Sequence, residues 1–143
     1  MKNVRAVVLA AGEGTRMRST LSKLLHLHPI SSQALVRFTV NACVESGIKR
    51  TIVVVGHQAE EVKSTLGEGF EYVYQDKRLG TGDALKQAVS FLRGFKGELV
   101  VVPGDAPFIT SSMLMKNKKG NIIWVSLTVN PIWEETCLKP TAK

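Results

Sequence analysis

The chain has 143 residues and a formal net charge of +7, with 19 lysines and arginines against 12 aspartates and glutamates, and this length suits one α/β domain with a buried core. It contains no apolar run of membrane-spanning length and no charged-then-apolar leader, so we expect a cytoplasmic protein without a membrane partner. Its basic residues are scattered except for Lys116, Lys118 and Lys119, and no aromatic side chains are interleaved with them, a pattern that disfavours nucleic acid as a partner.

Strand patterns and helix patterns alternate along the chain. Apolar or alternating runs predict strands over residues 4–10, 50–56, 70–75 and 98–105. Apolar residues at helical spacing predict helices over residues 33–46, 58–66 and 80–94. Thr81 or Asp83 is a candidate N-cap for the last of these helices. The alternation predicts right-handed crossovers and a mainly parallel sheet between two layers of helices, a three-layer, Rossmann-like α/β fold.

Three segments follow predicted strands at the edge where α/β folds bind their ligands. They are a glycine-rich loop from residue 11 to about residue 32, the stretch 75–82, and Asp105. Because the carboxyl ends of parallel strands meet at one edge of the sheet, we expect these segments to share one pocket.

The glycine-rich loop begins with the stretch LAAGEGTRM, residues 9–17. A P-loop requires GxxxxGK followed by serine or threonine, whereas Gly12 and Gly14 are separated by one residue and no lysine follows directly. The dinucleotide fingerprint GxGxxG is incomplete, because Met17 stands where the third glycine belongs. The spacing therefore excludes a P-loop and disfavours a dinucleotide site.

The same loop combines glycines with a hydroxyl and two cations. Glycine allows the backbone to approach a ligand and to turn its N–H groups toward it. Thr15 adds a hydroxyl, and Arg16 and Lys23 add positive charges that form strong hydrogen bonds to phosphate oxygens. We interpret the loop as a site for a polyphosphate.

Four stretches in this order and spacing carry a family resemblance: LAAGEGTRM with Lys23 downstream, VVVGHQAEEV, YQDKRLGTGDAL and VVPGDAPFI. They resemble the sugar-phosphate nucleotidyltransferases, and within that family the uridylyltransferases that form UDP-N-acetylglucosamine. The resemblance covers residues from about Val4 to Ile109. It implies transfer of a uridylyl group from UTP to N-acetylglucosamine 1-phosphate or a related sugar 1-phosphate, with release of pyrophosphate and with Mg²⁺ as cofactor.

The resemblance also implies roles for particular residues. Arg16 and Lys23 would be catalytic, neutralising the phosphates around the reacting centre, and Asp105 would supply a carboxylate to Mg²⁺. Gln75 would hydrogen-bond the uracil edge. The residues that would bind the nucleotide are Leu9, Ala10, Ala11, Gly12, Gly14, Thr15, Gln75, Gly80 and Thr81.

The resemblance stops after Ile109, which predicts two parts: a nucleotide-binding half over residues 1–110 and a divergent segment over residues 111–143. Within that segment, NIIWVSLTV predicts one more strand. The chain also departs from the family pattern at Ser22 and Arg78, which leaves the base open among uracil, guanine and cytosine.

Two classes of function remain open on this sequence. The first is a nucleotidyltransferase that uses UTP and a sugar 1-phosphate. The second is a nucleotide-binding or assembly module without catalysis, because the half of the family's domain that binds the acceptor sugar is not recognisable here. A homo-oligomeric state is compatible with either class.

Overall fold

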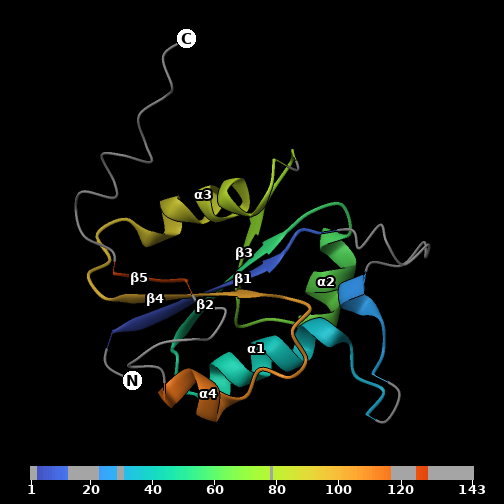
Figure 1. Cartoon of the computed structure of the whole chain (residues 1–143). Helices are drawn as coiled ribbons and strands as arrows, with labels where there is room; N and C mark the ends of the chain where they lie inside the picture. Colours follow the sequence, from blue (N-terminus) through green and yellow to red (C-terminus); the bar gives the residue numbers. More distant parts are fainter. Residues whose placement is uncertain (1–2, 13–22, 29–30, 78, 117–124, 129–143) are drawn as a thin grey trace.

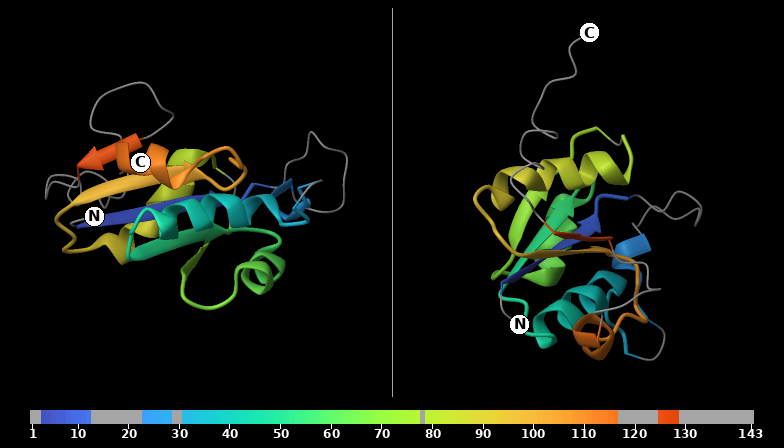
Figure 2. Two further views of the ribbon diagram at one scale, coloured as in Figure 1. Left: turned by 90° about the horizontal axis from the view of Figure 1, so that it is seen from below. Right: turned by 60° about the vertical axis from the view of Figure 1, so that its left-hand side comes forward.

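A central sheet organises the chain, and the computed structural model describes residues 3–12, 23–28, 31–77, 79–116 and 125–128. The strands in these ranges are β1 (Val4–Ala10), β2 (Arg50–Val55), β3 (Glu71–Tyr74), β4 (Glu98–Pro103) and β5 (Val125–Thr128). Their order in the sheet is β3-β2-β1-β4-β5. The first four strands are parallel, and β5 is antiparallel to β4 at one edge, as Figure 2 shows. The four predicted strands are confirmed, and β5 lies within the stretch NIIWVSLTV.

Helices cover both faces of the sheet. The helical elements are η2 (Lys23–Leu25), α1 (Leu35–Glu45), α2 (Ala59–Leu66), α3 (Thr81–Leu92) and α4 (Ser111–Lys116). Of these described helices, α3 lies on one face, and α1, α2 and α4 lie on the other (Figure 1). The predicted three-layer α/β fold is therefore confirmed. None of the helices in the described ranges has the length and apolar character of a membrane span.

The start of α3 differs from the prediction. Its N-cap is Gly80, and no side chain caps the helix, so neither Thr81 nor Asp83 has the predicted capping role. The carboxylate of Asp83 instead accepts a hydrogen bond from the side chain of Gln75. This contact involves a residue outside the helix, which helical spacing alone does not indicate.

Strand β1 is buried on both of its faces, which explains its almost continuous apolar sequence. Ala6 and Val8 belong to the core cluster beneath α1 and α2, whereas Val7 belongs to the cluster beneath α3. Cys43 of α1 is fully buried in the first cluster, and this burial raises the pKa of its thiol to about 12. A packing role for Cys43 agrees with both observations.

Part of the chain after residue 110 packs against this fold. Leu114 of α4 is buried in the cluster that contains α1. Strand β5 extends the sheet, with Leu127 paired to Leu99 and Val125 paired to Val101 of β4. The division of the chain at residue 110 into parts with different roles stays a prediction.

The register of the sheet brings three strand ends to one edge. Ala10 of β1 pairs with Val55 of β2, and Leu9 pairs with Pro103 of β4. The backbone N–H of Gly104 donates to the carbonyl of Leu9 at 2.9 Å, which holds the chain after β4 against β1. The loops that follow these strands therefore leave the sheet side by side.

Gly56, directly after β2, allows the close approach of two of these loops. A Cβ atom at this position would lie 2.7 Å from the carbonyl oxygen of Ala11 and 3.2 Å from its Cβ. Nothing larger than glycine fits there without moving the backbone that follows β1.

We expect Gly56→Ala to lower the free energy of unfolding by about 1–3 kcal/mol, because the added methyl group overlaps the backbone of Ala11. The measurement is urea-induced unfolding followed by circular dichroism. Gly82→Ala is the matched control. A Cβ at Gly82 meets no atom within 4 Å, and alanine stabilises a helix by up to ~1 kcal/mol relative to glycine. Equal unfolding free energies for the two variants would contradict this packing.

Candidate functional site

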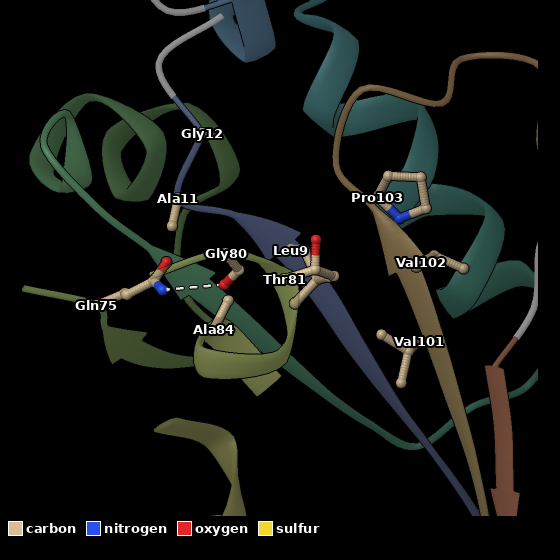
Figure 3. A pocket seen from close by; sticks show the side chains of 10 residues that line it. All are labelled: Leu9, Ala11, Gly12, Gln75, Gly80, Thr81, Ala84, Val101, Val102 and Pro103. Carbon is tan, nitrogen blue, oxygen red and sulfur yellow. Dashed lines mark hydrogen bonds between the residues drawn. The ribbon is translucent and has the colours of Figure 1, made fainter. Parts of the chain in front are cut away.

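A cavity of about 450 Å³ lies at the carboxyl edge of the sheet. It opens between the end of β1, the loop before α3 and the end of β4 (Figure 3). Its lining residues are Leu9, Ala11, Gly12, Gln75, Gly80, Thr81, Ala84, Val101, Val102 and Pro103. The first six of these belong to the predicted nucleotide-binding set, so the structure brings together residues from two of the three predicted segments.

Two glycines leave room on the walls of this cavity. A Cβ atom added to Gly12 or to Gly80 would meet no atom within 4 Å. Gly80 also has a φ of +98°, a conformation that side-chain-bearing residues rarely adopt. A ligand can therefore approach the backbone at both positions, which a side chain would prevent.

The remaining walls are mostly apolar. Ala84, Val101, Val102 and Pro103 line the cavity but were not among the predicted site residues. Ala84 and Val101 belong to the core cluster beneath α3, and the arrangement of α3 over the ends of β1 and β4 brings them to the cavity. The side chain of Val102 points to the opposite face of β4, where it is fully buried in the other cluster (Figure 3). Small and branched apolar side chains of this kind suit the flat face of a ring.

Gln75 is a buried polar residue among those that line the cavity, and it is only 4% exposed. Its backbone N–H donates to the carbonyl of Val55 at 2.8 Å, which fixes the chain beyond β3. Its side-chain Nε2 donates to Asp83 Oδ2 at 2.8 Å and to the carbonyl of Gly80 at 3.4 Å (Figure 3 shows the second bond). Gln75 therefore ties the end of β3 to the first turn of α3.

A smaller recess of about 110 Å³ adjoins the first cavity, with which it shares Leu9 and Gly12. Its other lining residues are Lys23, Leu24 and Asp105. Lys23 Nζ lies 2.7 Å from Asp105 Oδ2, so a predicted catalytic cation and the predicted metal-binding carboxylate form an ion pair. Residues 82 positions apart in the chain are thus in direct contact beside the apolar cavity.

The backbone around the ion pair is anchored by buried side chains. Lys23 begins the short helix η2, in which Leu24 and Leu25 are 4% and 7% exposed. Asp105 follows Gly104, where a Cβ would lie 3.0 Å from both the Leu24 side chain and the Leu9 carbonyl. The buried leucines and this tight glycine place the two charged side chains at the same edge.

The described residues contain no group of three or more histidine, cysteine, aspartate or glutamate side chains that could hold a metal ion. Asp105 offers one carboxylate, and its Oδ2 is engaged by Lys23. Mg²⁺ is commonly held by one or two carboxylates together with phosphate oxygens of a substrate. The donor set at Asp105 therefore fits a hard cation that shares its coordination with a phosphate ligand.

Four predicted site residues are not among the described residues that line the two cavities. Ala10 is 3% exposed, belongs to the core cluster beneath α1 and α2, and is not among the residues that line the two cavities. Gly14, Thr15 and Arg16 lie outside the described residues, and their roles stay predictions.

We expect the contact between Lys23 and Asp105 to contribute less than ~1 kcal/mol to the free energy of unfolding without ligand, because the side chains are 42% and 36% exposed. A double-mutant cycle with Lys23→Ala and Asp105→Ala, measured by urea unfolding, determines this coupling. The exposed pair of Lys63 and Glu60 on α2, 3.0 Å apart, is the reference cycle. A coupling well above that of the reference would indicate a structural role for the pair.

Known proteins resemble this chain in both sequence and structure. The chain is 46% identical over 109 residues to the bifunctional protein GlmU of Exiguobacterium sibiricum, a match that covers 76% of this chain and 24% of that protein. It is 45% identical, with the same coverage, to the bifunctional protein GlmU of Bacillus subtilis. The chain thus spans about a quarter of the length of these curated relatives.

Among solved structures, a nucleotidyl transferase from Methanothermobacter superposes with a TM-score of 0.67 at 28% identity, covering 81% of this chain and 56% of that one. Rv0371c from Mycobacterium tuberculosis, solved as a complex with manganese, has the same fold, with a TM-score of 0.65 at 22% identity over 80% of this chain and 57% of that one. The profile of the family described as MobA-like NTP transferase domain matches residues 6–118. That span contains both cavities and the four stretches on which the sequence resemblance rests, and the chain belongs to this family of nucleotidyltransferases.

Proposed function

We propose that the chain binds UTP and transfers its uridylyl group to N-acetylglucosamine 1-phosphate or a related sugar 1-phosphate. The observation that carries this proposal is the junction of the two cavities at Leu9 and Gly12. An apolar space with one buried amide suits a base, and the adjoining recess with a cation and a carboxylate suits the phosphates. The backbone at Gly12 lies between them, where the nucleotide's ribose and first phosphate would pass.

The reaction requires two anions to meet. The phosphate of the sugar attacks the α-phosphorus of the nucleotide in line, and the bond to the departing pyrophosphate breaks, with its electrons remaining on the pyrophosphate oxygen. Lys23 would neutralise part of the charge that develops there, and Arg16 would add a second positive charge. No covalent intermediate with the protein is needed.

Asp105 would hold Mg²⁺ in this proposal. When bound, Mg²⁺ supplies positive charge to the phosphates and helps to order them. Because both members of the Lys23–Asp105 pair are partly exposed, an arriving triphosphate can take over the lysine and release the carboxylate oxygen. The ion pair would therefore balance both charges until the ligand replaces it.

A second candidate function is nucleotide binding without turnover. The cavities described above account for the nucleotide, whereas the bifunctional relatives are about four times as long as the segment matched here, as their 24% coverage indicates. The acceptor site would then be supplied by another polypeptide segment. A homo-oligomeric state and a cytoplasmic location stay predictions from the sequence.

Pyrophosphate release separates the two functions. With UTP, Mg²⁺ and N-acetylglucosamine 1-phosphate, the enzyme proposal expects stoichiometric pyrophosphate and UDP-N-acetylglucosamine, measured by a coupled phosphate assay and by mass spectrometry. Isothermal titration with UTP measures binding in parallel. Binding without release would support the module. Absence of UTP binding would refute the enzyme proposal, and absence of binding to UTP, GTP and CTP alike would refute the module as well.

We expect Lys23→Ala and Arg16→Ala each to weaken UTP binding roughly ten- to a hundredfold, since a charge-assisted hydrogen bond contributes about 1.5–3 kcal/mol. Titration calorimetry at fixed Mg²⁺ and fixed ionic strength provides the measurement. Lys63→Ala removes an equal charge from the outer surface of α2 and is expected to leave the affinity unchanged. If all three variants bind UTP equally, these cations do not hold the triphosphate.

A further inference from the structure

We propose that Asp83 determines the base preference of the cavity by fixing the orientation of the Gln75 side-chain amide. This inference rests on the proposed nucleotide site and deepens it, because it names the residue that selects the base. Asp83 is not among the residues lining the cavity, so it acts as a positioning residue through Gln75.

The geometry admits one orientation of the amide. Gln75 Nε2 lies 2.8 Å from Asp83 Oδ2 and 3.4 Å from the carbonyl oxygen of Gly80. A carboxylate and a carbonyl can only accept hydrogen bonds, so both require the NH₂ group of Gln75 on their side. Rotation of the amide by 180° would place Gln75 Oε1 against two acceptors. Figure 3 shows the resulting arrangement, with Oε1 on the side of Ala11 and Nε2 directed toward Gly80.

The surroundings strengthen this constraint. Gln75 is 4% exposed, so water cannot easily replace a lost partner of its amide. Asp83 lies in the first turn of α3, where the helix dipole stabilises a negative charge. The 2.8 Å contact therefore pairs a buried amide with a stabilised anion, a stronger arrangement than a bond between two neutral groups.

The orientation has a chemical consequence at the cavity. With its NH₂ group engaged, Gln75 offers the ligand an acceptor, Oε1. Among pyrimidines, uracil carries a hydrogen on the ring nitrogen of its pairing edge and can donate it, whereas cytosine has an unshared electron pair there. Opposite that ring nitrogen the fixed Oε1 favours uracil over cytosine, whose donor on this edge is the neighbouring exocyclic amino group. Without Asp83 the amide can rotate and offer its NH₂ group to cytosine instead.

The test compares dissociation constants for UTP and CTP, both with Mg²⁺, by titration calorimetry. The ratio of CTP to UTP dissociation constants is expected to exceed one for the unmodified chain and to fall about fivefold or more in Asp83→Ala, the factor that one typical hydrogen bond supplies. Gln75→Ala should lower the ratio as well. In Gln75→Ala/Asp83→Ala the ratio should equal that of Gln75→Ala, because Asp83 acts only through the amide.

Asp76→Ala is the matched control. Asp76 is exposed, is adjacent to Gln75 and is not among the residues lining the cavity, so its removal changes the local charge equally. The ratio of CTP to UTP dissociation constants for Asp76→Ala should equal that of the unmodified chain. Asp83→Asn provides a second variant of nearly unchanged size, and the ratio should fall in the same direction because the asparagine amide can accommodate either orientation of Gln75.

Several outcomes would overturn the inference. An unchanged ratio in folded Asp83→Ala or Asp83→Asn would do so, as would a preference of the unmodified chain for CTP. A further fall on adding Asp83→Ala to Gln75→Ala would show that Asp83 acts by another route. The proposed enzyme fails separately, if UTP binds with the expected preference but no pyrophosphate is released. Failure to bind either nucleotide would refute both proposals.

Discussion

The parallel pairing of β1 with both β2 and β4 is the constraint on which the site depends. Because β1 lies between these strands in register, the chain leaves all of them at one edge, and the bond from the Gly104 N–H to the Leu9 carbonyl extends this pairing beyond β4. The first cavity, the recess with Lys23 and the loop with Asp105 all border Leu9 or Gly12. A change of register in β1 would therefore separate the apolar cavity from the recess that contains Lys23 and Asp105.

The site contains two hydrogen-bonded pairs, Gln75 with Asp83 and Lys23 with Asp105, and the surroundings of the two pairs differ. On one side, Gln75 is bound to Asp83 and is almost fully buried, so its orientation is fixed. On the other, Lys23 and Asp105 are paired but partly exposed, so their contact is easily exchanged for contacts with a ligand. Burial thus distinguishes a side chain of fixed orientation from a pair whose contact can be exchanged.

Two glycines allow close packing of the backbone that supports both regions. At Gly56 the backbone of one loop contacts Ala11 of another, and at Gly104 the backbone contacts Leu24 and Leu9. Gly12 and Gly80 have the opposite property, because a Cβ there would face open space in which a ligand can lie. Glycine therefore allows close packing at Gly56 and Gly104 and leaves room for a ligand at Gly12 and Gly80.

The sequence by itself determined the four parallel strands, the layers of helices and the family, because apolar periodicity and ordered short motifs are local properties of the chain. It also indicated Gln75, Lys23 and Asp105 as candidates, because they lie in segments that follow strands and because the family resemblance implies roles for them. Only the tertiary structure decided that Asp83 contacts Gln75 and not the helix end, and that Lys23 contacts Asp105. It also decided that apolar residues such as Val101 line a cavity. These contacts join segments whose distance and orientation depend on how β1, β3, β4 and α3 pack, and no local pattern records that geometry.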